Sequence, residues 1–147
     1  MVDSDTEVNK MRKIVCCTLI VCLAFLLTAC SGVARFATVQ IGESEKFTKD
    51  EIKEAVQVVR ESAFESTFVT RIVYDEARSD AVVQGYMETG KGSINGVAAD
   101  NVIVLFTDFV TGGNTGALNP HDVYTGYNWI LIRDGEGGVW TVDDCGY

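Results

Sequence analysis

Apolar residues recur at three- and four-residue intervals between residues 49 and 65, and this spacing predicts one amphipathic helix. Thr48, followed three residues later by Glu51, has the pattern of a capping box, in which each side chain binds the other residue's backbone N–H. Phe47 and Ile52 flank this cap at the spacing of a hydrophobic staple. The apolar stripe comprises Ile52, Ala55, Val56, Val59 and Ala63. We therefore expect a helix that begins after Thr48 and packs its apolar side on a sheet.

Stretches rich in β-branched and aromatic residues predict the strands of that sheet. They cover residues 67–74, 101–110, 124–134 and 139–143, and partial alternation predicts a further edge strand at 34–41. The stretch 101–110 is the most apolar of these, so we expect it at the centre of the sheet. In the stretch 67–74, alternation places every second side chain on the same face. This set is Phe68, Thr70, Ile72 and Tyr74.

A second, short helix is expected to be capped by Ser79 or Asp80 and to run through Met87, with Gly90 ending it. Gly85 lies inside this run and weakens the helical pattern. Helices precede the hairpins along the chain, which is typical of an α+β fold. The expected architecture is one long N-terminal helix packed on a curved antiparallel sheet of about four strands, preceded by a signal segment.

Residues 11–30, MRKIVCCTLIVCLAFLLTAC, have the pattern of a bacterial lipoprotein signal. Arg12 and Lys13 supply positive charge, and the run of fourteen residues that follows is apolar except for Thr18. A membrane span needs about 20 apolar residues, so the run has the length of a signal peptide. Small residues then precede Cys30, which predicts cleavage between Ala29 and Cys30 and lipidation of the thiol. An uncleaved signal anchor is the alternative.

These features divide the chain into a signal peptide at 1–29, a lipidated cysteine and tether at 30–46, and a single α+β domain at 47–147. The first ten residues carry acidic side chains where such signals are basic, so Met11 is a candidate true start and an N-terminal extension is the alternative. The expected location is the extracytoplasmic face of a cell membrane, with the lipid on Cys30 as the membrane contact.

Composition limits the partners of the mature chain. The 118 residues from Cys30 onward contain nine Lys and Arg against eighteen Asp and Glu, a net charge of −9. Such a surface repels nucleic acid, so DNA or RNA binding is not expected. Cys145 is the remaining cysteine after Cys30, which leaves neither a disulfide within the mature chain nor a cysteine-based zinc site. Cys145 is either a buried apolar residue or a free thiol.

No residue pattern identifies a reaction, and no cofactor or metal is expected. His121, the single histidine, has Asp122 and Asp108 as candidate partners but no triad signature. Asp143 and Asp144 are adjacent on a predicted strand, where alternation would place them on opposite faces, so they are not expected to share a proton. A calcium site in the long loop 111–122 is a weak alternative. Its oxygen ligands would come from Asn114, Asn119 and Asp122, although such residues are also common in irregular turns.

Aromatic side chains give the one candidate pocket. Tyr127, Trp129 and Leu131 alternate on one face of the strand at 124–134, with Asn128, Ile130 and Ile132 on the other. Packing of one face against the helix is the simpler explanation. The functional alternative is a pocket edged by Tyr127, Trp129 and Trp140, with His121 nearby.

Four segments resemble a family of small, uncharacterised lipoproteins from Gram-positive bacteria. They are IGESEKFTKDEI, VYDEARS, GSINGVAADNVIVL and YNWILIRDGEGGVWTVDDCGY, within residues 39–147. The resemblance implies a cystatin-like or nuclear-transport-factor-2-like cone, in which a long helix is cradled by a curved antiparallel sheet. The chain departs from the pattern at Cys145, where an aromatic residue is expected. The family assigns no catalytic residues.

These observations favour a non-enzymatic, membrane-anchored accessory domain that binds a small ligand or an envelope protein through the concave sheet. A small hydrolase or isomerase with a polar pocket in the cone is one alternative, and it would require a carboxylate of raised pKa inside a cavity. A structural cell-envelope protein is the other alternative, and it would require a filled cone.

Overall fold

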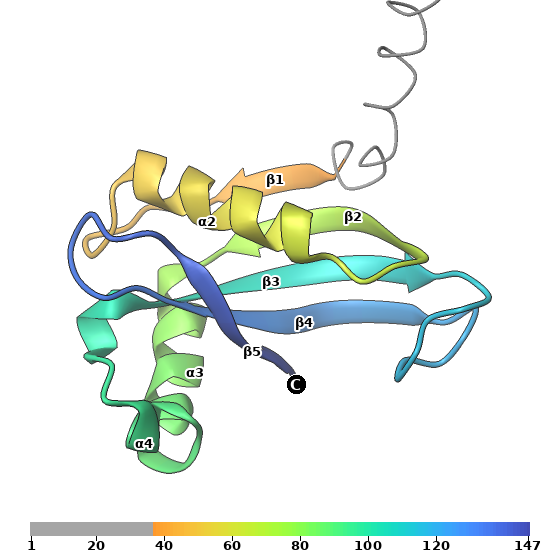
Figure 1. The fold of residues 1–147 in the computed structure, drawn as a ribbon. Coiled ribbons are helices and arrows are strands. Elements are labelled where there is room, and N and C mark those ends of the chain that lie inside the picture. Colours follow the sequence, from red (N-terminus) through yellow and green to blue (C-terminus); the bar gives the residue numbers. More distant parts are fainter. Residues whose placement is uncertain (1–36) are drawn as a thin grey trace, which may run out of the picture. The chain divides into compact units, whose positions relative to one another are not determined.

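The computed structural model describes residues 37–147, which form an α+β domain with a five-stranded mixed sheet (Figure 1). The strands are β1 (Thr38–Ile41), β2 (Thr67–Tyr74), β3 (Val102–Thr111), β4 (Val123–Ile132) and β5 (Thr141–Gly146). Their spatial order follows the chain, so β3 is central, as expected from its apolar sequence. The signal segment, Met11, Ala29 and Cys30 lie outside the described residues.

The sheet is not wholly antiparallel, which corrects the sequence-based expectation. β1 pairs with β2 in parallel, with Thr38 opposite Arg71 and Ile41 opposite Tyr74. The other three pairings are antiparallel. A parallel pair needs a crossover connection, and the long helix between β1 and β2 provides it. The expected edge strand therefore exists, but as a four-residue parallel strand that adds a fifth member to the sheet.

Helices lie on both faces of the sheet, so the expectation of one long helix is also corrected. The helices are α2 (Lys49–Ser62), α3 (Glu76–Thr89) and α4 (Gly92–Asn95), with a 3-10 turn at Ala99–Asn101. α2 and α3 have fourteen residues each. Buried residues of α2 belong to one apolar core and those of α3 to another, on opposite sides of the sheet. None of the described helices is both long and apolar enough to span a membrane.

The start of α2 confirms the capping box. The Thr48 side chain accepts the backbone N–H of Glu51 at 3.3 Å, and the Glu51 carboxylate accepts the backbone N–H of Thr48 at 2.8 Å. Phe47 and Ile52 are both buried in the core between α2 and the sheet. The helix ends at Ser62, three residues before the expected end.

α3 begins earlier than expected because Asp75, rather than Ser79 or Asp80, provides its cap. The Asp75 carboxylate accepts the backbone N–H of Arg78 at 2.9 Å. Ser79 is buried instead, and its hydroxyl oxygen accepts the backbone N–H of Val104 at 3.1 Å. Gly90 ends the helix as predicted, with its N–H bonded to the carbonyl of Tyr86.

A bulge in β2 breaks the alternation expected for that strand. Val69 pairs with Phe109 and Arg71 with Asp108, so Thr70 is an extra residue. Val69 therefore shares the buried face with Ile72 and Tyr74, whereas Phe68 is exposed. Alternation does hold in the second half of β4: Tyr127, Trp129 and Leu131 pack on the α2 side, and Ile130 and Ile132 on the α3 side.

Candidate functional site

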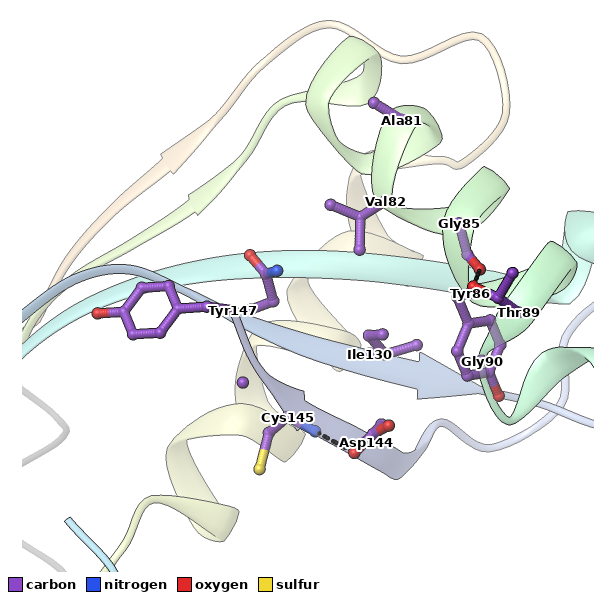
Figure 2. A pocket seen from close by; sticks show the side chains of 12 residues that line it. Ala81, Val82, Gly85, Tyr86, Thr89, Gly90, Ile130, Asp144, Cys145 and Tyr147 are labelled. Carbon is purple, nitrogen blue, oxygen red and sulfur yellow. Dashed lines mark hydrogen bonds between the residues drawn. The ribbon is translucent and has the colours of Figure 1, made fainter.

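A groove of about 360 Å³ lies between α3 and the end of β5 (Figure 2). This volume is at the lower end of the range of small-ligand sites. One wall is α3, which contributes Ala81, Val82, Gly85, Tyr86 and Thr89. The other wall is formed by β4, β5 and the residue after β5, which contribute Asn128, Ile130, Asp144, Cys145, Gly146 and Tyr147. We call this the α3–β5 groove.

Gly85 keeps the helical wall of the groove open. A Cβ atom added at this position would meet no other heavy atom within 4 Å, so no packing contact requires a glycine there. Glycine inside a helix costs about 0.5–1 kcal/mol relative to alanine. By contrast, a Cβ at Gly92 would lie 2.5 Å from the Tyr86 ring, and one at Gly90 would lie 2.9 Å from the Tyr86 carbonyl oxygen. Gly90 and Gly92 are therefore explained by packing, whereas Gly85 is not.

A hydrogen-bond network fixes the opposite wall by tying β5 to α3 and α4. The Tyr86 hydroxyl donates to the Asp143 carboxylate at 2.8 Å and accepts from the Asn95 amide at 2.7 Å. The Lys91 ammonium donates to the Asp143 backbone carbonyl at 2.6 Å. Burial, and then the hydrogen bond to Asp143, raises the pKa of Tyr86 to about 12. The tyrosine therefore stays a neutral donor across the physiological range.

Asp143 and Asp144 do not lie on opposite faces, which corrects the expectation from alternation. Ile130 pairs with Asp144 and Leu131 with Val142, so Asp143 is the extra residue of a bulge. Asp144 lies 3.5 Å from the Lys91 ammonium, on the side where Asp143 meets Tyr86. The two carboxylates have separate partners.

Side chains also cap the outer edge of β5 beside the groove. The backbone N–H of Cys145 donates to the Asp144 carboxylate at 3.0 Å, and the backbone carbonyl of Asp143 accepts a hydrogen bond from the Lys91 ammonium. The Cys145 sulfur points away from α3 (Figure 2) and lies 3.8 Å from the Tyr127 hydroxyl. Cys145 is one of the residues that line the groove, but its half-buried free thiol points away from α3. Because these edge groups are occupied, a ligand in the groove would meet side chains before it met free backbone.

A second cavity, of about 590 Å³, lies at the loop between β1 and α2 and is bordered by Glu76. The Glu76 carboxylate accepts from the Ser44 hydroxyl and from the backbone N–H groups of Glu45 and Lys46, at 3.1 and 3.2 Å respectively. The hydrogen bond from Ser44, followed by that from Glu45, lowers the pKa of Glu76 to about 2. The Ser44 hydroxyl and the two backbone N–H groups are thus already bonded to Glu76 and are not free to bind a ligand. The α3–β5 groove is therefore the stronger candidate.

The aromatic residues of the candidate pocket are part of the core between α2 and the sheet. Tyr127, Trp129 and Trp140 are 8%, 3% and 3% exposed, and neither cavity is lined by them. The Trp129 indole donates to the Thr107 hydroxyl at 3.0 Å, and the Trp140 indole donates to the Glu51 carbonyl at 3.1 Å. Packing against the helix, the simpler of the two explanations, therefore describes these side chains.

His121 is not brought together with these aromatic residues. It is an exposed residue of the β3–β4 loop with a backbone φ of 55°, and its N–H donates to the carbonyl of Gly112 at 3.0 Å. The calcium alternative in the same loop has little support, because the Asp122 carboxylate accepts from the Asn119 amide and from the backbone of Val123. Within residues 37–147 no three His, Cys, Asp or Glu side chains cluster as metal ligands would.

Three described carboxylates have a displaced pKa, and each is displaced downward. Hydrogen bonds from Lys53 lower the pKa of Asp50, those from Arg133 lower the pKa of Glu51 to about 2, and Glu76 behaves as described above. A general acid in a cavity needs the opposite shift. The hydrolase or isomerase alternative therefore gains no support from these three groups.

Sequence reasoning missed the α3–β5 groove. Its residues come from α3 and from the β4–β5 hairpin, which are far apart in the chain and are brought together only by the fold. One signal was available: Gly85 interrupts an otherwise helical run, and a glycine inside a helix lowers its stability. Comparison of the chain with protein-family models, with curated proteins and with solved structures finds no match.

Proposed function

We propose that residues 37–147 are a non-enzymatic ligand-binding module, held at the extracytoplasmic face of a cell membrane by lipid on Cys30. The lipoprotein signal pattern at residues 11–30 supports the location. Each buried methylene of an acyl chain contributes about 0.8 kcal/mol, and two chains give stable anchoring. The folded module then needs no membrane-spanning element of its own.

The observation that carries the binding function is Gly85, which faces open space in the α3–β5 groove. The helix would be more stable with alanine at this position, so folding does not favour glycine there. A ligand bound against the helix would use the space that the missing side chain leaves. A glycine lets a bound molecule approach the backbone more closely than any other residue does.

The groove suits a small molecule with one apolar side and hydrogen-bond donors on the other. Val82 and Ile130 give an apolar surface, while the Asn128 amide and the Asp144 carboxylate supply polar groups at the rim. Asp144 is an acceptor with 43% of its side chain exposed. The capped edge of β5 disfavours addition of a peptide strand, because its Asp143 carbonyl and Cys145 N–H are already occupied.

A fragment screen by nuclear magnetic resonance tests the site. Binding fragments should shift the amide signals of Gly85, Asn128 and Gly146 in the wild-type domain. Gly85→Leu should abolish these shifts because its side chain fills the groove, whereas Gly85→Ala should keep most of them. Fragments that shift the same signals equally in Gly85→Leu would contradict the assignment.

The anchor is tested separately. Mass spectrometry of the membrane fraction should find an N-terminal Cys30 that carries diacylglyceryl, and Cys30→Ser should release the protein from that fraction. An unmodified Cys30 in membrane-bound protein would overturn the lipoprotein assignment.

A structural role in the cell envelope is the second candidate, and the packing beneath α2 favours it. Phe64 packs within 5.3 Å of Trp129 and 6.1 Å of Tyr127, ring centroid to centroid, so aromatic rings fill the space that an open cone would offer. Packing of α2 on the antiparallel strands β2–β5 is the arrangement that the resemblance to cystatin-like folds implies, although α3 on the opposite face is an addition to that plan. Failure of the fragment screen would favour this structural role.

A further inference from the structure

Three exposed apolar side chains form a row across the sheet. Phe68 of β2 is opposite Val110 of β3, and Val110 is in turn opposite Val123 of β4. The three side chains are 53%, 38% and 65% exposed. Because directly paired residues project from the same face, these side chains form one contiguous surface. We call this surface the apolar strip.

The apolar strip lies on the part of the α3 face that α3 does not cover. Val104 and Phe106 of β3 are buried in the core beneath α3, and the Arg78 guanidinium lies 3.9 Å from the centre of the Phe106 ring. The next residue of β3 on this face is Asp108, which forms a 2.7 Å ion pair with Arg71. This pair separates the covered core from Val110, so the strip is a surface of its own and not an extension of the core.

The strip is at the end of the sheet where the chain enters the domain. β1 runs parallel to β2 with Thr38 opposite Arg71, and Phe68 precedes Arg71 by three residues. The usual strand rise and spacing place Phe68 roughly 11 Å from Thr38. Figure 1 shows β1 beginning at the end of the sheet where β3 passes into β4. Eight residue steps separate Cys30 from Thr38, and covalent geometry limits that distance to about 28 Å.

We propose that the apolar strip rests on the head-group boundary of the bilayer that holds the lipid on Cys30. This proposal depends on the lipid anchor of the proposed function. A short tether keeps the strip at high effective concentration beside the membrane, so even a contact that is weak in solution is populated. The contact is apolar, since the Arg71–Asp108 pair is neutral and the acidic mature chain is not attracted to anionic lipid.

A bilayer fits the strip better than a second copy of the chain does. A stable interface between two proteins buries about 800 Å² on each partner, and three side chains cover much less than that. A lipid surface has no such requirement when the protein is already anchored, because the acyl chains supply the affinity. The strip then orients the module, and the β4–β5 turn, at the opposite end of the sheet, is held away from the membrane.

Quenching by brominated lipid tests this orientation on the full lipidated chain. Phe68→Trp places a fluorophore in the strip, and Val139→Trp places one in the β4–β5 turn, at a side chain that is also exposed (82%). The native Trp129 and Trp140 are 3% exposed and contribute a constant background in both variants. In vesicles of phosphatidylcholine with brominated acyl chains, Phe68→Trp should lose several-fold more emission than Val139→Trp, and added salt should not reverse the loss.

Vesicle flotation separates the possible failures. A chain that does not float lacks the anchor, so the proposed location and this inference both fail. A chain that floats while Phe68→Trp is quenched no more than Val139→Trp keeps its anchor but overturns the strip contact. Cross-linking of the strip into a dimer would also overturn it, in favour of a second copy. Val123→Trp repeats the measurement on β4 in case Phe68→Trp fails to fold.

Discussion

Arg133 and Glu51 join the end of β4 to the first turn of α2. The Arg133 guanidinium lies 2.5 Å from the Glu51 carboxylate, and only 4% of the arginine side chain is exposed. The same guanidinium is 4.6 Å from the Trp140 ring centre and 5.5 Å from that of Phe47. Because the Glu51 carboxylate also bonds to the Thr48 N–H, one carboxylate both caps the helix and fixes it to the sheet.

Glu51→Gln should destabilise the domain by about 3 kcal/mol, since it leaves the Arg133 charge buried without its partner. Glutamine retains the capping box, so the loss reports on the ion pair rather than on the cap. Chemical denaturation measures the effect. Asp50→Asn is the matched control, because Asp50 pairs only with Lys53 at the exposed surface and should change stability by less than about 0.5 kcal/mol.

The double variant Glu51→Gln/Arg133→Met completes the test. Removing both partners removes the unpaired buried charge, so most of the stability lost in the single variant should return. Equal stability losses in the single and double variants would show that the cost lies elsewhere.

Acid should destabilise the domain between about pH 4.5 and pH 2. The hydrogen bond from Arg133 lowers the pKa of Glu51 to about 2, and hydrogen bonds from Ser44 and Glu45 lower that of Glu76 to about 2, both from 4.5. A folded-state pKa below the unfolded one gives stability that is present above pH 4.5 and lost as the pH falls. Denaturation midpoints measured from pH 7 to pH 2 check this, and the decline should be shallower in Glu51→Gln.

Two glycine-to-alanine changes should have opposite effects. Gly85→Ala should stabilise the domain by about 0.5–1 kcal/mol, because helix propensity improves and the new Cβ meets open space. Gly92→Ala should destabilise it by about 1–3 kcal/mol, because its Cβ would overlap the Tyr86 ring. Thermal unfolding compares the two variants. If Gly92→Ala instead stabilised the domain, the Tyr86 ring would have to lie elsewhere, and its hydrogen bond to Asp143 would not hold it in this position.

Tyr86→Phe should cost about 1–2 kcal/mol, since the hydroxyl bonds both Asp143 and Asn95. The pKa of Tyr86 is raised from 10 to about 12, so its stabilising contribution is present below pH 10 and declines as the pH rises towards 12. The stability difference between wild type and variant should therefore shrink over that interval. Tyr147→Phe, at a side chain that is 78% exposed, is the control and should change little.

The sequence predicted those features of the fold that depend on residues close together in the chain. The Thr48–Glu51 capping box, the stop at Gly90 and the β2 stretch at 67–74 all agree with the structure, since each depends on residues a few positions apart. The start of α3 was wrong because Asp75 is also a good cap, and Ser79 is drawn into the core by its bond to Val104. Choosing between two competent caps requires the packing to be known.

The α3–β5 groove and the apolar strip depend on longer-range geometry. A single extra residue at Thr70 reverses the faces of β2 and exposes Phe68, and another at Asp143 puts two neighbouring carboxylates on one side. Bulges are set by how two strands pair, and no periodicity within one strand reveals them.

The amino-acid sequence by itself determined the acidic composition, the helix after Thr48, the α+β class and the strand order along the chain, and it carries the residue pattern on which the proposed signal rests. These follow from composition and from side-chain spacing, which act over one or two turns of backbone. Only the tertiary structure decided that β1 is parallel, that α3 covers just part of its face, and that Gly85 opens onto a groove. Those features arise from burial shared among elements far apart in the chain, which local spacing does not encode.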